Sequence, residues 1–189
     1  MELSEAIRGR RSVRLYTGEP VADDTIRAMC EAAVLAPSSM NSQPWHFHVA
    51  TEAVRDEVGQ IMALTTRYLQ EYIEVLGAEM VERAARFYED LGGAPVVIAV
   101  STPVVDDPLE QADGYMSVGA AVENLMLSAL DAGLGSCNIS APKWVLDRLL
   151  EAFRVPEGRT IASLVLLGHP EEPDSPQERD FDVVTFVGR

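Results

Sequence analysis

The sequence predicts a layered domain of the α+β or α/β class. Short apolar stretches with strand character alternate with long segments of helical composition, so most connections between strands are helical. The chain has 189 residues, of which 47% are hydrophobic, and this suits one domain with a full core. Because no internal repeat, low-complexity tract or linker interrupts the pattern, we expect residues 1–189 to form a single domain.

Two helices are predicted near the N-terminus. Residues 3–9 form a short one that ends at Gly9, and residues 22–35 form a longer one that Pro37 ends. Asp23 or Asp24 is the expected N-cap of the longer helix. Its apolar stripe consists of Ile26, Met29, Cys30, Ala33 and Val34. Membership in this stripe predicts that Cys30 is a buried small hydrophobe.

Three segments predict strands. Residues 92–102 and 160–170 contain continuous apolar runs, as strands buried on both faces do. Residues 45–50 alternate instead, and this pattern predicts that one face of the strand is buried. The residues expected on that buried face are Trp45, Phe47 and Val49. Residues 183–187 are either a last short strand or an extended tail.

The remaining segments predict helices. Residues 51–91 are helical in composition, with a break near Gly77. The longest helix spans 109–132, with Gly133 at its C-terminal end. Its buried stripe consists of Val118, Ala121, Val122, Leu125 and Ala129. Residues 141–153 predict another helix, with Pro142 near its first turn.

The charge balance excludes some partners. The chain has 30 acidic and 15 basic residues, for a formal net charge of −15. Such a surface repels nucleic acid and anionic lipid, so we expect neither as a partner. The N-terminal residues do not resemble a signal peptide, and no segment has the roughly 18 apolar residues of a membrane span. We therefore expect a cytoplasmic protein.

Several common site motifs do not occur in the sequence. It contains neither a Gly-x-Gly-x-x-Gly turn, nor a P-loop, nor a Gly-x-Ser-x-Gly elbow. The histidines His46, His48 and His169 lack partners at metal-ligand spacing, and Cys30 and Cys137 are far apart. We expect no metal site, and we interpret Cys137 as a packed thiol at a helix end.

Two polar segments are candidates for ligand binding. Residues 8–14, RGRRSVR, hold four of the 15 basic residues. Arginine forks suit a phosphate, although such a segment could also simply balance the acidic surface. Residues 36–49, APSSMNSQPWHFHV, combine short polar side chains with a tryptophan. They could line a ligand that needs many hydrogen bonds, or they could provide turn chemistry beside a core Trp.

Together with further motifs, these segments resemble the FMN-dependent nitroreductase family over nearly the whole chain. The motifs are RRSVRLY (10–16) followed by PV (20–21), APSSMNSQPWHFHV (36–49), GAPVVI (93–98), GAAVENLMLSALDAGLGSCNIS (119–140), and LLGHP (166–170) followed by Arg179. Their order and spacing also fit the family.

The resemblance implies a three-layer α/β/α sandwich with a central, mostly antiparallel sheet, in an interlocked homodimer with FMN at the interface. It implies reduction of nitroaromatics, quinones or similar small electron-poor acceptors with NADH or NADPH. In this scheme flavin N5 carries the hydride in alternating, ping-pong half-reactions, and no side chain is assigned as catalytic. Residues 51–91 would form a lid or dimer region, and residues 171–189 a C-terminal extension.

The resemblance also implies roles for individual residues. The flavin phosphate, ribityl chain and pyrimidine edge would be held by Arg10, Arg11, Ser12, Arg14 and Arg179. The partner subunit's loop would reach the same flavin through Pro37, Ser38, Ser39 and Asn41. Backbone N–H groups at Ile139, Ser140 and Ala141 would approach N5 and O4. Arg67 is a further candidate for the pyrimidine edge.

One segment departs from the usual family pattern. Most relatives have an aromatic residue after the cysteine and Gly or Glu-Gly shortly beyond, whereas this chain has Asn138, Ser140 and Ala141. Two alternatives therefore stay open. One is an enzyme of the same fold with other chemistry, such as dehalogenation, enone reduction or flavin fragmentation. The other is a protein that stores or senses FMN without turnover.

Overall fold

A central four-stranded sheet organises the computed structural model, which describes all residues except 70, 72, 172–177 and 189. The strands are β1 (His46–Ala50), β2 (Val96–Pro103), β3 (Gly135–Ile139) and β4 (Arg159–Gly168). Their order is β1-β2-β4-β3, and every neighbouring pair is antiparallel. The expectation of a mostly antiparallel sheet is thus confirmed.

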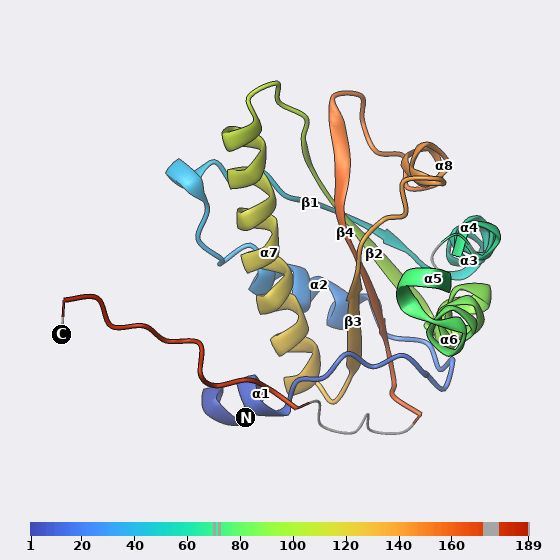
Figure 1. Ribbon diagram of the computed structural model, residues 1–189, viewed down its shortest axis with the longest axis horizontal. Coiled ribbons are helices and arrows are strands. Elements are labelled where there is room, and N and C mark those ends of the chain that lie inside the picture. Colours follow the sequence, from blue (N-terminus) through green and yellow to red (C-terminus); the bar gives the residue numbers. More distant parts are fainter. Residues whose placement is uncertain (70, 72, 172–177, 189) are drawn as a thin grey trace.

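Helices cover both faces of this sheet. They are α1 (Leu3–Gly9), α2 (Asp23–Ala33), α3 (Glu52–Ala63), α4 (Thr66–Leu69), α5 (Ile73–Leu76), α6 (Ala78–Asp90), α7 (Pro108–Asp131) and α8 (Leu146–Ala152), with short 3-10 turns η1 (Ser39–Asn41) and η3 (Leu91–Gly93). Figure 1 shows α7 on one side of the sheet and α3, α6 and α8 on the other. This arrangement is the expected three-layer sandwich. None of the described helices is both long and apolar enough to cross a membrane.

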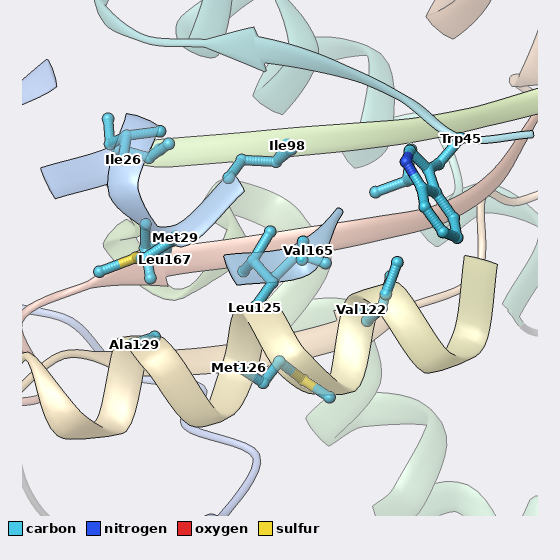
Figure 2. Close-up of a cluster of buried hydrophobic side chains, with 14 of the residues drawn as sticks. Ile26, Met29, Trp45, Ile98, Val122, Leu125, Met126, Ala129, Val165 and Leu167 are labelled. Carbon is cyan, nitrogen blue, oxygen red and sulfur yellow. The ribbon is translucent and has the colours of Figure 1, made fainter. Parts of the chain in front are cut away.

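One half of the core lies between the sheet and the α2–α7 pair. Figure 2 shows Leu125 of α7, Ile98 of β2 and Val165 of β4 in this layer. All three side chains are fully buried, and Trp45 closes one end of the cluster. Burial of a side chain of this size contributes roughly 1.5–3 kcal/mol to folding. The predicted apolar stripe of α7 is buried throughout, so that expectation is confirmed.

The second half of the core lies on the opposite face of β2 and β4. Val97 and Leu164 point there and are fully buried against residues of α3 and α8, including Met62 and Leu149. Because β2 is buried on both faces, its sequence is a continuous apolar run, as predicted.

Both ends of α7 are stabilised by local hydrogen bonds. At the N-terminus, Oδ1 of Asp107 accepts from the backbone N–H groups of Leu109 and Glu110, at 2.8 and 3.1 Å. At the C-terminus, Gly133 has φ +76° and its N–H donates to the carbonyl of Leu130. Leu134 donates to the carbonyl of Ala129, which completes a Schellman motif and confirms the expected glycine end.

The expected details of α2 were partly wrong. Ala22 is the N-cap, with no side-chain hydrogen bond, and Asp23 and Asp24 lie in the first turn instead. There their charges still favour the positive end of the helix dipole. Val34 follows the last helical residue and is exposed, while Cys30 is only half-buried. Burial raises the pKa of the Cys30 thiol, which keeps it protonated at neutral pH.

The other helices begin and end at different places than expected. Gly77, with φ +80°, does precede α6, but the segment before it is divided into α3, α4 and α5. Helix α8 begins at Leu146, because residues 142–145 form turns in which the N–H of Val145 donates to the carbonyl of Pro142. Pro142 therefore belongs to the turn that precedes the helix.

Two expectations, for Val49 and Cys137, were also wrong. Val49 is 44% exposed, because β1 is an edge strand and Val49 lines an open hollow between β1 and α2. Cys137 is buried in β3, a strand that the sequence did not predict, and not at a helix end. Residues 183–187 have no strand assignment and belong to an extended tail.

Candidate functional site

The arginine-rich segment lies beside β3. Ser12 forms an isolated parallel bridge with Ser136, and the N–H of Val13 donates to the Ser136 carbonyl at 2.9 Å. Gly135 makes this approach possible, because a Cβ there would lie 2.8 Å from both methyl groups of Val13. Ile139 lies three residues beyond Ser136 along β3, which corresponds to a distance of about 10 Å. The fold thus brings together two of the predicted flavin-binding segments.

The arginines of this segment differ in their contacts. Arg10 donates from Nε to Glu123 of α7 at 2.9 Å and is half-buried. Arg11 donates to the carbonyls of Arg8 and Arg10, and exposed Arg14 donates to the carbonyl of Ser12 at 3.1 Å. The bonds of Arg11 and Arg14 thus hold their side chains along their own segment, whereas Arg10 ties that segment to α7.

Unsatisfied backbone donors follow β3. Within the part of the chain that the structure describes, the N–H groups of Ser140 and Ala141 have no hydrogen-bond acceptor. Ser140 is exposed, and Ala141 is half-buried. Because a donor that is partly shielded from water without a partner is costly, a ligand acceptor at the N–H of half-buried Ala141 would stabilise the structure.

The polar loop at 37–43 is held against the first half of α7. The N–H of Ser39 donates to Oγ of Ser117 at 3.2 Å, and the Ser39 hydroxyl donates to Oδ2 of Asp113 at 3.1 Å. The Ser38 hydroxyl accepts from the N–H of Gln43 at 3.0 Å.

The backbone of this loop adopts an uncommon conformation. Three of its non-glycine residues have positive φ, namely Met40 at 49°, Asn41 at 55° and Gln43 at 47°. Each such residue costs of order 1 kcal/mol, and surrounding contacts must hold it in place. Met40 at its tip is 98% exposed, and Pro37 and Asn41 are exposed as well.

Within one chain, the structure does not bring this loop to the arginine segment. The loop contacts α7 at Asp113, whereas Arg10 contacts α7 at Glu123. Ten residues of α-helix separate these two contacts by about 15 Å. Arg179 lies in the exposed stretch 178–188, which has neither helix nor strand. Arg67 is exposed on α4.

The sequence did not reveal a polar network at the base of the loop. Arg159 of β4 donates to the carbonyl of Pro44 at 2.6 Å, and to the carbonyl and hydroxyl oxygens of Ser101 at 2.8 and 2.9 Å. Nε2 of His48 lies 3.0 Å from the Ser101 hydroxyl. Because that hydroxyl accepts from Arg159, its proton is directed to a neutral His48. The network thereby fixes the end of the loop to the sheet.

We expect this network to weaken as the pH falls below about 6.5, the ordinary pKa of histidine. Burial lowers the pKa of His48 in the folded protein, and the charges of His46 and Arg159 lower it further. The unfolded chain therefore takes up a proton first, which favours unfolding until the folded protein also titrates.

Urea midpoints measured at about pH 7.5 and about pH 5.5 should differ less in His48→Gln than in the wild type. The matched control, His169→Gln, should behave as the wild type does, and equal pH dependence in all three would contradict this assignment.

A separate hollow of about 400 Å³ lies between α2 and β1. Its lining residues are Asp23, Ile26, Arg27, Cys30, Phe47, Val49 and Thr51. None of the predicted flavin-binding residues is among them, so this hollow is distinct from the candidate site.

The donor groups of the candidate site fit FMN. Within the described part of the chain, Arg10 donates a side-chain hydrogen bond only from Nε. Its Nη groups are therefore available to a phosphate. The amide donors at Ser140 and Ala141 suit the acceptor edge of a flavin ring, and the exposed guanidinium of Arg14 suits a site of negative charge on such a ring. Arrangements of this kind define a flavin-binding protein of the three-layer α/β/α class.

Comparison with known proteins agrees with this class. The Nitroreductase family model matches residues 7–169. The chain is 31% identical over 185 residues to an Archaeoglobus fulgidus protein named as an NADH dehydrogenase/NAD(P)H nitroreductase, covering 95% of this chain and 89% of that protein. The chain therefore belongs to the nitroreductase family, as its sequence motifs predicted.

Solved structures show the same fold. A BluB-like flavoprotein from Clostridium difficile has a TM-score of 0.78 and 27% identity, over 99% of each chain. A protein from Desulfovibrio desulfuricans described as a nitroreductase in complex with FMN has a TM-score of 0.72 and 28% identity. That match covers 96% of this chain and 93% of the other.

Proposed function

We propose that this protein reduces nitroaromatics, quinones or similar small electron-poor compounds with NADH or NADPH. Its family makes it an NAD(P)H-dependent oxidoreductase that uses FMN. The observation that supports the proposal is the pairing of the arginine segment with β3, which brings the residues we assign to the phosphate close to those we assign to the flavin ring. Bound FMN would supply the redox chemistry, accepting a hydride from NAD(P)H and passing it to the acceptor in alternating half-reactions.

The residues of the chain then bind and orient the cofactor. Arg10, with Arg11 and Arg179, would hold the phosphate, and Ser12 would bond the ribityl chain. Arg14 would stabilise negative charge at the pyrimidine edge, which raises the reduction potential of the flavin. The N–H groups at Ile139 to Ala141 would fix the height and tilt of the ring. Rapid hydride transfer needs this positioning more than it needs an acid or a base, and we assign no side chain to proton transfer.

A homodimer would complete the site. The loop residues Pro37, Ser38, Ser39 and Asn41 lie too far along α7 to join the arginines of their own chain, so we assign them to the flavin of the partner subunit. The exposed apolar residues of the tail support a dimer as well. They are Phe181, Val183, Val184, Phe186 and Val187. Side chains of this kind gathered in one segment are typical of an interaction surface.

Anaerobic reduction tests the proposal most simply. We expect the purified protein to be yellow, and NADH or NADPH to bleach the flavin absorbance near 450 nm in the absence of oxygen. Addition of a nitroaromatic or a quinone should then restore the colour. A yellow protein that neither nucleotide bleaches would favour the storage or sensing alternative. A colourless protein that cannot be loaded with FMN would contradict every flavin-based function.

A further inference from the structure

Tyr68 of α4 and Trp144 form a stacked aromatic pair. Their ring centres lie 5.1 Å apart, and the rings are inclined by only 4°. Nζ of Lys143 lies 5.5 Å from the centre of the Trp144 ring, within the range of a cation–π interaction. Trp144 is half-buried, whereas Lys143 is exposed and Tyr68 is 36% exposed. The group therefore combines an aromatic wall with an accessible positive charge.

The position of this pair relates it to the candidate site. Trp144 is three residues beyond Ala141, and three extended residues span at most about 11 Å. Tyr68 belongs to α4, in the helical region 51–91 that the family resemblance assigns to a lid or dimer region. The stack thus joins that helical region directly to the segment whose N–H groups are assigned to the flavin ring.

The charge of Lys143 is unusual in this chain. It is the only lysine among the 189 residues of a protein with a net charge of −15. The nearest carboxylate along the sequence belongs to Asp147, yet Lys143 makes no ion pair within the described part of the chain. Because the surrounding field repels anions, one unpaired cation close to the segment assigned to the flavin ring would favour the approach of anionic acceptors.

We propose that Lys143 and the Tyr68–Trp144 stack form one wall of the acceptor site and select planar aromatic acceptors that carry a carboxylate. The stacked rings contact the flat face or edge of the acceptor, and the ammonium of Lys143 pairs with its anionic substituent. This inference rests on the proposed function, because it concerns the acceptor half of the same reaction.

Steady-state kinetics with a matched pair of acceptors tests this assignment. The probes are 4-nitrobenzoate and its methyl ester, which differ in charge but not in ring or nitro group. In Lys143→Met, KM for the carboxylate should rise about fivefold, the size of effect that one exposed charge pair provides. KM for the ester should stay unchanged, so the ratio of the two KM values isolates the effect of the charge pair. In Tyr68→Leu, KM should rise for both acceptors in the same proportion.

The matched control is Arg83→Met, which removes an exposed cation of α6 and should alter neither KM. If Lys143→Met changes both acceptors equally, or neither, the inference is overturned. It is also overturned if the wild type is reduced by NAD(P)H but transfers electrons to neither probe, although the proposed function would survive that result. A wild type that NAD(P)H does not reduce would overturn the proposed function itself.

Discussion

Gly92→Ala should destabilise the protein by about 3–5 kcal/mol, a large part of the stability of a typical domain. Gly92 has φ +65°, and a Cβ placed there would lie 1.9 Å from the carbonyl oxygen of Arg14. The Gly92 carbonyl also accepts from the N–H of Tyr16 at 2.9 Å. The segment of Gly92 and the segment of Arg14 are thus held together by a backbone hydrogen bond. An alanine at position 92 must therefore displace the segment that carries Arg14.

A second glycine, Gly158, separates the steric clash at residue 92 from the conformational penalty of placing alanine at a positive φ. Gly158 has φ +80° but nothing within 4 Å of its Cβ position. Gly158→Ala should therefore cost only the conformational penalty of about 1 kcal/mol. Urea unfolding of the FMN-free proteins measures both values, and FMN retention should fall only in Gly92→Ala. If the two variants were equally stable, the close approach at Arg14 would not be a structural requirement.

Arg10→Ala should raise the dissociation constant for FMN about 30-fold, which corresponds to roughly 2 kcal/mol. The expected loss is that of a charge-assisted bond to the phosphate. The same substitution also removes the ion pair with Glu123, whose carboxylate is 44% exposed. Since exposed pairs contribute at most about 1 kcal/mol, the folded protein should persist.

The control for Arg10 is Glu123→Gln, which weakens the same ion pair but keeps the guanidinium. This variant should bind FMN as tightly as the wild type or more tightly, because Arg10 is then released to the phosphate. Titration of the FMN-free proteins, followed by flavin fluorescence, measures the three constants. Equal weakening by the two substitutions would show that Arg10 acts by holding α7 and not by binding phosphate.

Much of the layered fold could be predicted from local patterns. The stripe of α7, the apolar runs of β2 and β4, and the break at Gly77 are periodic or compositional signals that depend on neighbouring residues. β3 was missed because GSCNI is short, begins with glycine and does not alternate. Its strand character comes from pairing with β4, where Cys137 lies opposite Leu166. The exposure of Val49 likewise depends on the edge position of β1.

The candidate site was predictable only in part. The arginine segment and Ile139–Ala141 were assigned to the flavin through the family resemblance, and the structure places the first beside β3 and the second at the end of that strand. Arg159 was missed because it contacts Pro44 from 115 positions away, and no local pattern marks such a pair. Glu123 was missed because a charged residue on a helix usually only faces solvent. Within one chain the loop 37–43 lies apart from the arginines, and for this reason we propose that a second subunit completes the site.

Flavin content of a mixed dimer tests this central claim most directly. One subunit carries Arg10→Ala with Arg14→Ala, and the other carries Ser39→Ala with Asn41→Ala. If each FMN is held by the arginines of one subunit and the loop of its partner, the mixed dimer has one doubly damaged site and one intact site. It should then bind one FMN tightly and recover half of the wild-type activity, although both parent homodimers bind FMN weakly. Two weakened sites in the mixed dimer, one like each parent homodimer, would contradict the account, because each flavin would then be bound within a single chain.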